Sequence, residues 1–285
     1  MAERLLAHQL DGQGETVLLL NGGMMSIAAW DSLAGPIAEQ FQVLRCDFFG
    51  QLKSPGEGHD ALADHVADLL HLLDHLKIDR VHVLGVSFGA EAGLLLAATA
   101  PERVRSLIAV TATDYITDSF REGSGRMIDI IARILEGGDR APFHDAMVED
   151  IFSQDYVDAH GEELAARRAQ MAFLPEPWFR GLDRLLRCTE KVDLRPHLAR
   201  IQAPSLVVIA SEDKVMLPER SRALATAIGA EVDEKAGSGH GLVIEHPEWL
   251  LRKCRHFLER HVSSDPPPPG NSSPSTVSQP PNSNP

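Results

Sequence analysis

A serine between two glycines is the first residue in this chain whose setting suggests chemistry. Ser87 lies in the segment GVSFG, between Gly85 and Gly89, after the apolar run VHVL and before AEAGLLLAATA, a typical helical pattern. On a sharp turn from strand to helix, small neighbours let the two elements approach, and the helix start places free N–H groups beside the serine oxygen. The segment therefore predicts a nucleophilic serine, although glycines and serine also form simple turns.

A serine hydroxyl is a weak nucleophile until a base takes its proton, and a carboxylate must orient that base. His240 lies in GSGHGLVIEHPEWL, a glycine-rich segment between a predicted strand and the last predicted helix, and is the candidate base. Four other histidines, His65, His71, His75 and His144, fall in helical patterns, so we expect them at the surface.

The carboxylate that would orient His240 has three candidates. Asp213 follows the apolar run SLVVIAS and stands five residues before Pro218, at the end of a predicted strand. Glu212 is its direct neighbour, and Asp114 follows the strand before a long helical stretch. Asp213 is the preferred acid, and the other two remain open alternatives.

The elements that must position these residues alternate along the chain. Short apolar runs, TVLLLNGG, FQVLRCDF, RVHVLGVS and VRSLIAVTA, are separated by helical patterns near 30–40, 60–77 and 88–99, and APSLVVIAS and EVDEKAGSGH follow later. This rhythm predicts an α/β fold with a mostly parallel, doubly wound sheet that is buried on both faces.

The rhythm breaks between residues 114 and 196, where only helical patterns occur. We expect helices over 121–136, 140–151, 155–172 and 177–188. The sequence therefore predicts an α/β core from 1–113 and 197–262 and a helical cap inserted at 114–196 over the carboxyl edge of the sheet. A plain packing layer of helices is the alternative.

Composition limits the partners and the compartment. Lys and Arg number 27 against 41 Asp and Glu, a formal charge of −14, which disfavours nucleic acid. The cysteines Cys46, Cys188 and Cys254 are odd in number and form no CxxC pair, no apolar run reaches the length of a membrane span, and no signal peptide is evident. We expect a cytoplasmic protein, with a disordered Pro/Ser-rich tail over 263–285.

The three motifs, in the order serine, acid, histidine, resemble the α/β-hydrolase superfamily, and the resemblance extends over about residues 15–261. In that family the first strand commonly ends in histidine and glycine, with a tryptophan nine residues after the histidine. This chain has Asn21, Gly22 and Gly23, with Trp30 at that spacing. Asparagine there is similar to 3-oxoadipate enol-lactonase-like members, and the family also includes carboxylesterases.

The resemblance implies that the backbone amides of Gly23 and Phe88 form the oxyanion hole, unless the first turn merely connects two elements. Met24, Met25 and Trp30 are candidates for an apolar substrate pocket, although core packing explains such residues as well. The segment DFFGQLKS, which begins at Asp47, replaces the family turn D-x-R-G-x-G-x-S, and we expect it to be structural.

The resemblance implies a serine hydrolase that cleaves a small apolar ester or lactone through an acyl-enzyme, without metal or cofactor. An acyltransferase that uses the same residues is the second hypothesis, since NGGM and DFFGQ look somewhat like segments of the rhamnolipid-precursor synthase family. A non-catalytic relative that binds a small apolar ligand or a partner protein is the third, because fold alone does not establish activity.

Overall fold

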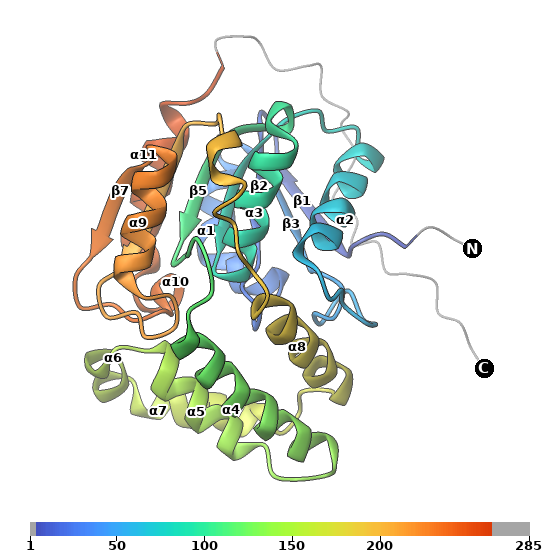
Figure 1. Ribbon diagram of the computed structural model, residues 1–285, viewed down its shortest axis with the longest axis vertical. Helices are drawn as coiled ribbons and strands as arrows, with labels where there is room; N and C mark the ends of the chain where they lie inside the picture. Colours follow the sequence, from blue (N-terminus) through green and yellow to red (C-terminus); the bar gives the residue numbers. More distant parts are fainter. Residues whose placement is uncertain (1–3, 264–285) are drawn as a thin grey trace.

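A single β-sheet forms the centre of the protein (Figure 1). The computed structural model describes residues 4–263, and within them seven strands pair in the order β1-β3-β2-β4-β5-β6-β7. The strands are β1 (His8–Gly12), β2 (Thr16–Leu20), β3 (Gln42–Cys46), β4 (Val81–Val86), β5 (Val104–Val110), β6 (Ser205–Ala210) and β7 (Glu231–Lys235). β1 pairs antiparallel with β3, and the other pairs are parallel. The predicted fold class is therefore confirmed.

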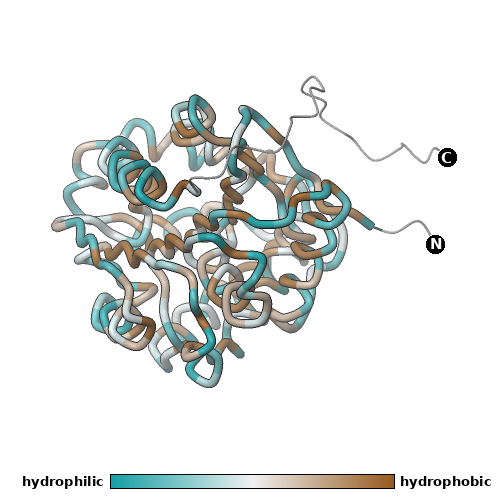
Figure 2. The backbone as a smooth tube through the Cα atoms, turned by 90° about the horizontal axis from the view of Figure 1, so that it is seen from above, coloured by the Kyte–Doolittle hydropathy of each residue, from teal (hydrophilic) through white to brown (hydrophobic). Residues whose placement is uncertain are grey.

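The burial of each strand explains its place in the sheet. β2, β4 and β6 read TVLLL, VHVLGV and SLVVIA and are buried along their whole length, as expected for strands covered on both faces. β7 at one edge reads EVDEK and is mostly exposed or half-buried. Charged side chains on an edge strand discourage pairing with another chain. Figure 2 shows hydrophobic positions across the middle of the molecule and hydrophilic ones mostly towards its outside.

Helices cover both faces of the sheet and build two separate core layers. α1 (Asp31–Ala38) and α11 (Pro247–Glu259) pack on one face, and α2 (Leu62–His75), α3 (Phe88–Thr99) and α9 (Pro218–Ile228) pack on the other. The short α10 precedes α11. It spans Leu242–Glu245. Three 3₁₀ helices complete the described core, η1 (Ile27–Trp30), η2 (Pro101–Arg103) and η3 (Leu198–Arg200).

Five α-helices stand between β5 and β6, and we call them the helical insertion. They are α4 (Asp118–Leu135), α5 (Ala141–Ile151), α6 (Gln154–Ala159), α7 (Gly161–Met171) and α8 (Glu176–Thr189). Figure 1 shows them gathered at one end of the sheet. Much of the insertion packs around its own apolar cluster, which includes Phe143, Trp178 and Phe179.

The two connections of the helical insertion are paired where they leave the core. Ile116 donates its amide to the carbonyl of Val192 at 3.1 Å, and Leu194 donates to Asp114 at 2.8 Å. An isolated antiparallel bridge joins Tyr115 to Asp193 between them. The base of the insertion is therefore a short hydrogen-bonded neck.

The predicted helix over 155–172 is wrong in one respect, because it is two helices. α6 ends at Ala159 and α7 begins at Gly161, and His160 between them has a φ of −121°. The His160 ring stacks on Tyr156 with centroids 3.9 Å apart, and its Nδ1 bonds to the carbonyl of Tyr156 at 2.9 Å. A side chain that competes for helix carbonyls favours a break at this position.

The predicted surface position of two helical histidines is also wrong. His65 and His144 are buried, whereas His75 is exposed. The His65 ring packs edge-on against Phe48 and Phe88, with centroids 5.5 and 5.1 Å apart. His65 stands at helical spacing between Leu62 and Leu69, so it belongs to the apolar stripe of α2.

Two absences can be stated for residues 4–263, while nearly all of the predicted tail lies outside them. No helix in this range is long and apolar enough to cross a bilayer. No group of three or more metal-ligating side chains gathers within it either.

Candidate active site

Ser87 occupies a strained turn between β4 and α3. Its φ of 52° and ψ of −124° lie where L-residues are rarely found, and such strain is retained only where the surroundings hold it. The Ser87 amide donates to the carbonyl of Val110 at 3.0 Å, while its own carbonyl accepts from the amides of Ala90 and Glu91 at 2.7 and 3.0 Å. The side chain is half-buried among buried neighbours.

The two glycines around Ser87 are required by close backbone contacts. A Cβ on Gly89 would lie 2.2 Å from the carbonyl oxygen of Leu20, and one on Gly85 would lie 2.4 Å from the carbonyl oxygen of Gly89. Both distances are far below a van der Waals contact. The spacing of the motif therefore reflects how tightly α3 approaches β2 and β4.

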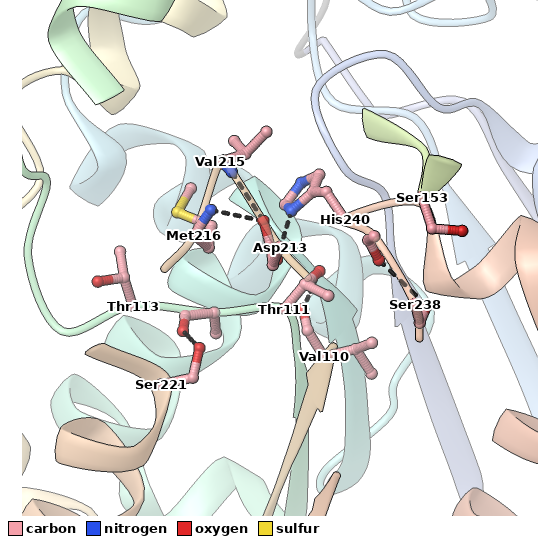
Figure 3. A network of polar contacts seen from close by, with 12 residues as sticks. Val110, Thr111, Thr113, Ser153, Asp213, Val215, Met216, Ser221, Ser238 and His240 are labelled. Carbon is pink, nitrogen blue, oxygen red and sulfur yellow. Dashed lines mark hydrogen bonds and ion pairs between the residues drawn. The ribbon is translucent and has the colours of Figure 1, made fainter. Parts of the chain in front are cut away.

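His240 and Asp213 form a buried pair at the carboxyl ends of the strands (Figure 3). Nδ1 of His240 lies 2.8 Å from Oδ2 of Asp213, and Oδ1 of Asp213 accepts from the amides of Val215 and Met216 at 2.8 Å each. The Asp213 side chain is 1% exposed. A carboxylate at Nδ1 fixes the tautomer, which leaves Nε2 as the nitrogen that can accept a proton.

The two alternative acids have other environments. Asp114 forms an ion pair with Arg220, in which Nε and Nη2 of the guanidinium each donate to one carboxylate oxygen. Glu212 is exposed, and its backbone amide donates to the carbonyl of Ser238 at 2.8 Å. Of the three candidate acids, Asp213 is the one in contact with His240.

The amides of Gly23 and Phe88 remain without a hydrogen-bond partner among the described residues. Phe88 is the first residue of α3, where an N–H group has no partner within the helix. Gln51 holds the other segment, because its Nε2 donates to the carbonyls of Gly22 and Gly23 at 2.8 and 3.3 Å. Unpaired amides at a helix start favour binding of an oxyanion.

Asn21 is the centre of a buried polar network behind this segment. Its Nδ2 donates to Asp47 and to Gln51 at 2.9 Å each, and its Oδ1 accepts from the indole of Trp30 at 2.7 Å. Burial raises the pKa of Asp47, against hydrogen bonds such as that from the amide of Lys53. The segment that begins at Asp47 thus has the structural contacts that the sequence led us to expect.

The three residues predicted to line a substrate pocket do not gather in one cluster. Met24 packs against the apolar cluster of the helical insertion, whereas Met25 packs against the core layer under α1 and α11. Trp30 is fully buried in that same layer. Leu182 of α8, which belongs to the same cluster as Met24, also lies near this segment, because its Cδ1 would be 3.8 Å from a Cβ on Gly23.

A cavity of about 450 Å³ lies beside α8, and its lining includes none of Ser87, Asp213 and His240. Three arginines of α8 line it, and each already has an acidic partner. The pairs are Arg180 with Glu176, Arg184 with Glu57 and Asp60, and Arg187 with Asp183. This cavity is therefore separate from the candidate catalytic residues, and all three of its arginines are already paired with carboxylates.

Glu91 and Glu245 are two buried carboxyl groups near the site that the sequence analysis did not select. Glu91 is fully buried, accepts from the amide of Thr113 at 3.3 Å, and has a pKa raised well above its usual range by burial and, less, by the charge of Asp213. Glu245 contacts the segment that carries His240. Its position five residues after His240 was visible in the sequence, but its partner in the insertion was not.

Comparisons with known proteins agree with this fold. A family model described as the alpha/beta hydrolase fold matches residues 15–247. The protein named RutD from Pseudomonas syringae pv. syringae, a carbamate hydrolase by name, is 30% identical over 251 residues, covering 85% of this chain and 93% of that protein. A pimeloyl-[acyl-carrier protein] methyl ester esterase from Aeromonas salmonicida is 27% identical over 259 residues, covering 87% and 96%.

Solved structures show the same fold. MGS-M2, an alpha/beta hydrolase enzyme from a Medee basin deep-sea metagenome library, superposes with a TM-score of 0.83 at 22% identity over 88% of this chain and 93% of that one. The enol-lactonase from Burkholderia xenovorans LB400 has a TM-score of 0.77 at 23% identity, covering 89% and 96%. Because the family model spans most of the chain and the sheet, turn and motif order agree with it, the chain belongs to the α/β-hydrolase fold family.

Proposed function

We propose that this enzyme hydrolyses a carboxylic ester or lactone through an acyl-enzyme on Ser87. The observation that carries the proposal is the buried contact of 2.8 Å between His240 and Asp213 at the same end of the sheet as the strained turn of Ser87. A base with a fixed tautomer and a nucleophile on a rigid turn are the parts that acyl transfer needs.

Each group has a defined step in this mechanism. Ser87 Oγ attacks the carbonyl carbon while Nε2 of His240 takes its proton, and Asp213 stabilises the imidazolium that forms. The amides of Gly23 and Phe88 donate to the oxyanion of the tetrahedral intermediate. Collapse of the intermediate breaks the ester C–O bond, and the imidazolium protonates the leaving alkoxide. Water, deprotonated by the same histidine, then releases the acid and restores the serine.

The names of the relatives support a small ester, lactone or carbamate as the substrate class. An enol-lactonase, a methyl ester esterase and a carbamate hydrolase all cleave a bond at a carbonyl carbon, to which this mechanism applies. Carbamate hydrolysis is the second candidate, favoured by the relative at 30% identity. Because substrate preference within one fold varies widely, a panel of substrates has to decide.

Replacement of the nucleophile tests the proposal directly. Ser87→Ala is expected to lower kcat for a short p-nitrophenyl ester by at least about a thousandfold, because no acyl-enzyme forms. Ser119→Ala, which removes an exposed serine hydroxyl in α4, is the matched control and should keep wild-type activity. A fluorophosphonate should label the wild type and not Ser87→Ala, as read by intact mass.

Retained turnover by folded Ser87→Ala would contradict the proposal. A panel of esters, lactones, carbamates and acyl thioesters, each with and without an added alcohol or hydroxyacid, should be followed by mass spectrometry. Free acid as the main product supports hydrolysis. A condensed acyl product in its place would assign the chain to acyl transfer.

A further inference from the structure

The carboxylate of Glu245 joins the His240 segment to the helical insertion. Its side chain is 1% exposed at the end of α10. Oε1 accepts from the amide of Ser153 at 2.9 Å, and Oε2 accepts from the Ser153 hydroxyl at 2.8 Å. The amide of Gly239, next to His240, donates to both oxygens at 3.2 Å. One buried carboxylate therefore binds the neighbour of His240 and the residue that precedes α6.

Backbone contacts reinforce this connection on both sides of His240. The Gly241 amide donates to the carbonyl of Ile151 at 2.8 Å. A Cβ on Gly239 would lie 2.7 Å from that same carbonyl oxygen, and one on Gly241 would lie 2.8 Å from the Phe152 ring. Figure 3 shows Ser153 beside the His240 segment. The insertion thus lies directly against the two glycines that flank the histidine.

Glycines give the backbone around His240 much intrinsic freedom, so its position depends on what holds it. The bond to Asp213 fixes one ring nitrogen, but it does not fix the backbone that carries the ring. Charge-assisted bonds from a buried carboxylate are about twice as strong as neutral ones, and here they come from Glu245. Glu245 itself does not replace Asp213, because it bonds the Gly239 amide and not the imidazole.

We propose that Ser153 and Glu245 are positioning residues for the catalytic base. The helical insertion then does more than cover the site, since its α5–α6 turn holds the His240 segment at the place from which the imidazole can reach Ser87. This inference rests on the proposed function. It assigns a role in proton transfer to a serine of the insertion that touches neither the substrate nor the reacting atoms.

Loss of the Ser153 hydroxyl is the sharpest test, because it removes little volume. It removes the hydrogen bond to Glu245 and also the N-cap bond of α6, in which the hydroxyl accepts from the amide of Tyr156 at 3.3 Å. Ser153→Ala should lower kcat for a p-nitrophenyl ester about tenfold to a hundredfold with KM changed less than about twofold, since small displacements of catalytic groups have effects of this size. Ser153→Thr keeps a hydroxyl and should recover most of the loss. Glu245→Gln should lower kcat in the same way.

Ser124→Ala is the matched control within the same insertion. The Ser124 hydroxyl is also buried and donates to the carboxylate of Glu190 at 2.6 Å, but neither residue contacts the His240 segment. The control should lose thermal stability to a similar degree as Ser153→Ala and keep wild-type kcat. Fluorophosphonate labelling of Ser87, which needs the same base, should slow in Ser153→Ala and Glu245→Gln and not in Ser124→Ala.

Several results would overturn the inference. Wild-type kcat and labelling rates in both Ser153→Ala and Glu245→Gln would do so, and so would an equal loss of kcat in Ser124→Ala. Should Glu245→Gln fail to fold, Ser153→Ala and Ser153→Thr decide alone. His240→Gln separates this failure from that of the proposed function. An active His240→Gln refutes the mechanism, whereas an inactive one beside unaffected Ser153→Ala and Glu245→Gln refutes only the positioning role.

Discussion

Asp213 and Asp114 show, at the scale of single residues, that the partner of a carboxylate decides what it can do. Both follow strands of the same sheet, and both are almost completely buried. Asp213 holds the ring of His240, whereas Asp114 holds the guanidinium of Arg220. The Arg220 side chain also lies over the ring of Tyr115 at 4.3 Å. Asp114 is thus part of the neck of the insertion.

These environments predict different effects for the same substitution, one on catalysis and one on stability. Asp213→Asn should lower kcat by about a thousandfold or more, because an amide at Nδ1 can stabilise the wrong tautomer. Asp114→Asn should keep kcat within a few-fold and lower the melting temperature, because Arg220 loses the charge of its ion-pair partner. Steady-state kinetics and thermal melts measure both. An inactive Asp114→Asn beside an active Asp213→Asn would move the acid to Asp114.

The candidate catalytic residues could be named from the sequence, whereas the residues that contact and position them could not. Ser87, Asp213 and His240 stand in short local patterns, a turn motif, a strand end and a glycine-rich segment, that one chain can reveal. The ion-pair partner of the alternative acid Asp114 could not be predicted in this way, because Arg220 lies more than a hundred residues after it. A contact between segments so distant leaves no local signal, and the same is true of Ser153 and Glu245.

At the scale of elements, α8 rests on the core through two glycines. Gly50, with φ of +98°, directly precedes Gln51 of the polar network. A Cβ on Gly181 of α8 would lie 1.9 Å from the carbonyl oxygen of Gly50. The next residue of α8, Leu182, faces Gly23. The position of α8 is therefore linked to the segment that carries a proposed oxyanion donor.

Gly181→Ala should destabilise the protein although alanine is the better helix former. The added methyl group forces α8 away from the core, and overpacking of this kind costs about 1–3 kcal/mol. Gly125→Ala in α4, where nothing lies within 4 Å of the new Cβ, is the matched control and should gain up to about 1 kcal/mol. Urea unfolding compares the two. Equal effects of both substitutions would show that the glycine contact is not tight.

The elements themselves were largely predictable, whereas their contacts were not. Apolar runs such as SLVVIA have a length and burial that define interior strands, so the parallel strands followed from the sequence. The antiparallel edge strand β1 did not, because HQLDG is short, mostly half-buried and contains no apolar run. The break between α6 and α7 did not, because the stacking of His160 on Tyr156 is a side-chain effect that helical periodicity does not register. The glycine contact of α8 with Gly50 joins elements far apart in the chain and was equally hidden.

At the scale of the whole molecule, two buried groups shift stability with pH in opposite directions. Burial lowers the pKa of His65 from 6.5 to about 4, with a smaller contribution from His59. The unfolded chain binds a proton below about pH 6.5 that the folded chain refuses, so stability is lost as pH falls from 6.5 towards 4. The raised pKa of Glu91 acts the other way, because the unfolded chain loses its proton above about pH 4.5 while the folded chain keeps it.

Two neutral replacements should separate these contributions. The lowered pKa of His65 corresponds to a loss of about 3 kcal/mol in the free energy of unfolding between pH 6.5 and 4. His65→Leu removes the titrating group and should flatten this loss. Glu91→Gln should flatten the loss as pH rises above about 4.5, so that its stability relative to the wild type increases towards neutral pH. Free energies of unfolding in urea between pH 4.5 and 8 measure both slopes. If the free energy of unfolding changed with pH in the same way in wild type and variants, the cost of charging these buried groups would not be the cause.

The attachment of the helical insertion has a consequence for how such enzymes diversify. The insertion meets the core at its neck, at Glu245 beside the histidine, and at Gly50 beside the polar network. Exchange of the whole insertion would have to preserve the contacts at all three places. An insertion taken from another member of the family would have to fit Glu245 and Gly50, which belong to the core of the recipient protein. New specificities should therefore arise in this lineage more readily by stepwise change within the insertion than by recombination of whole insertions.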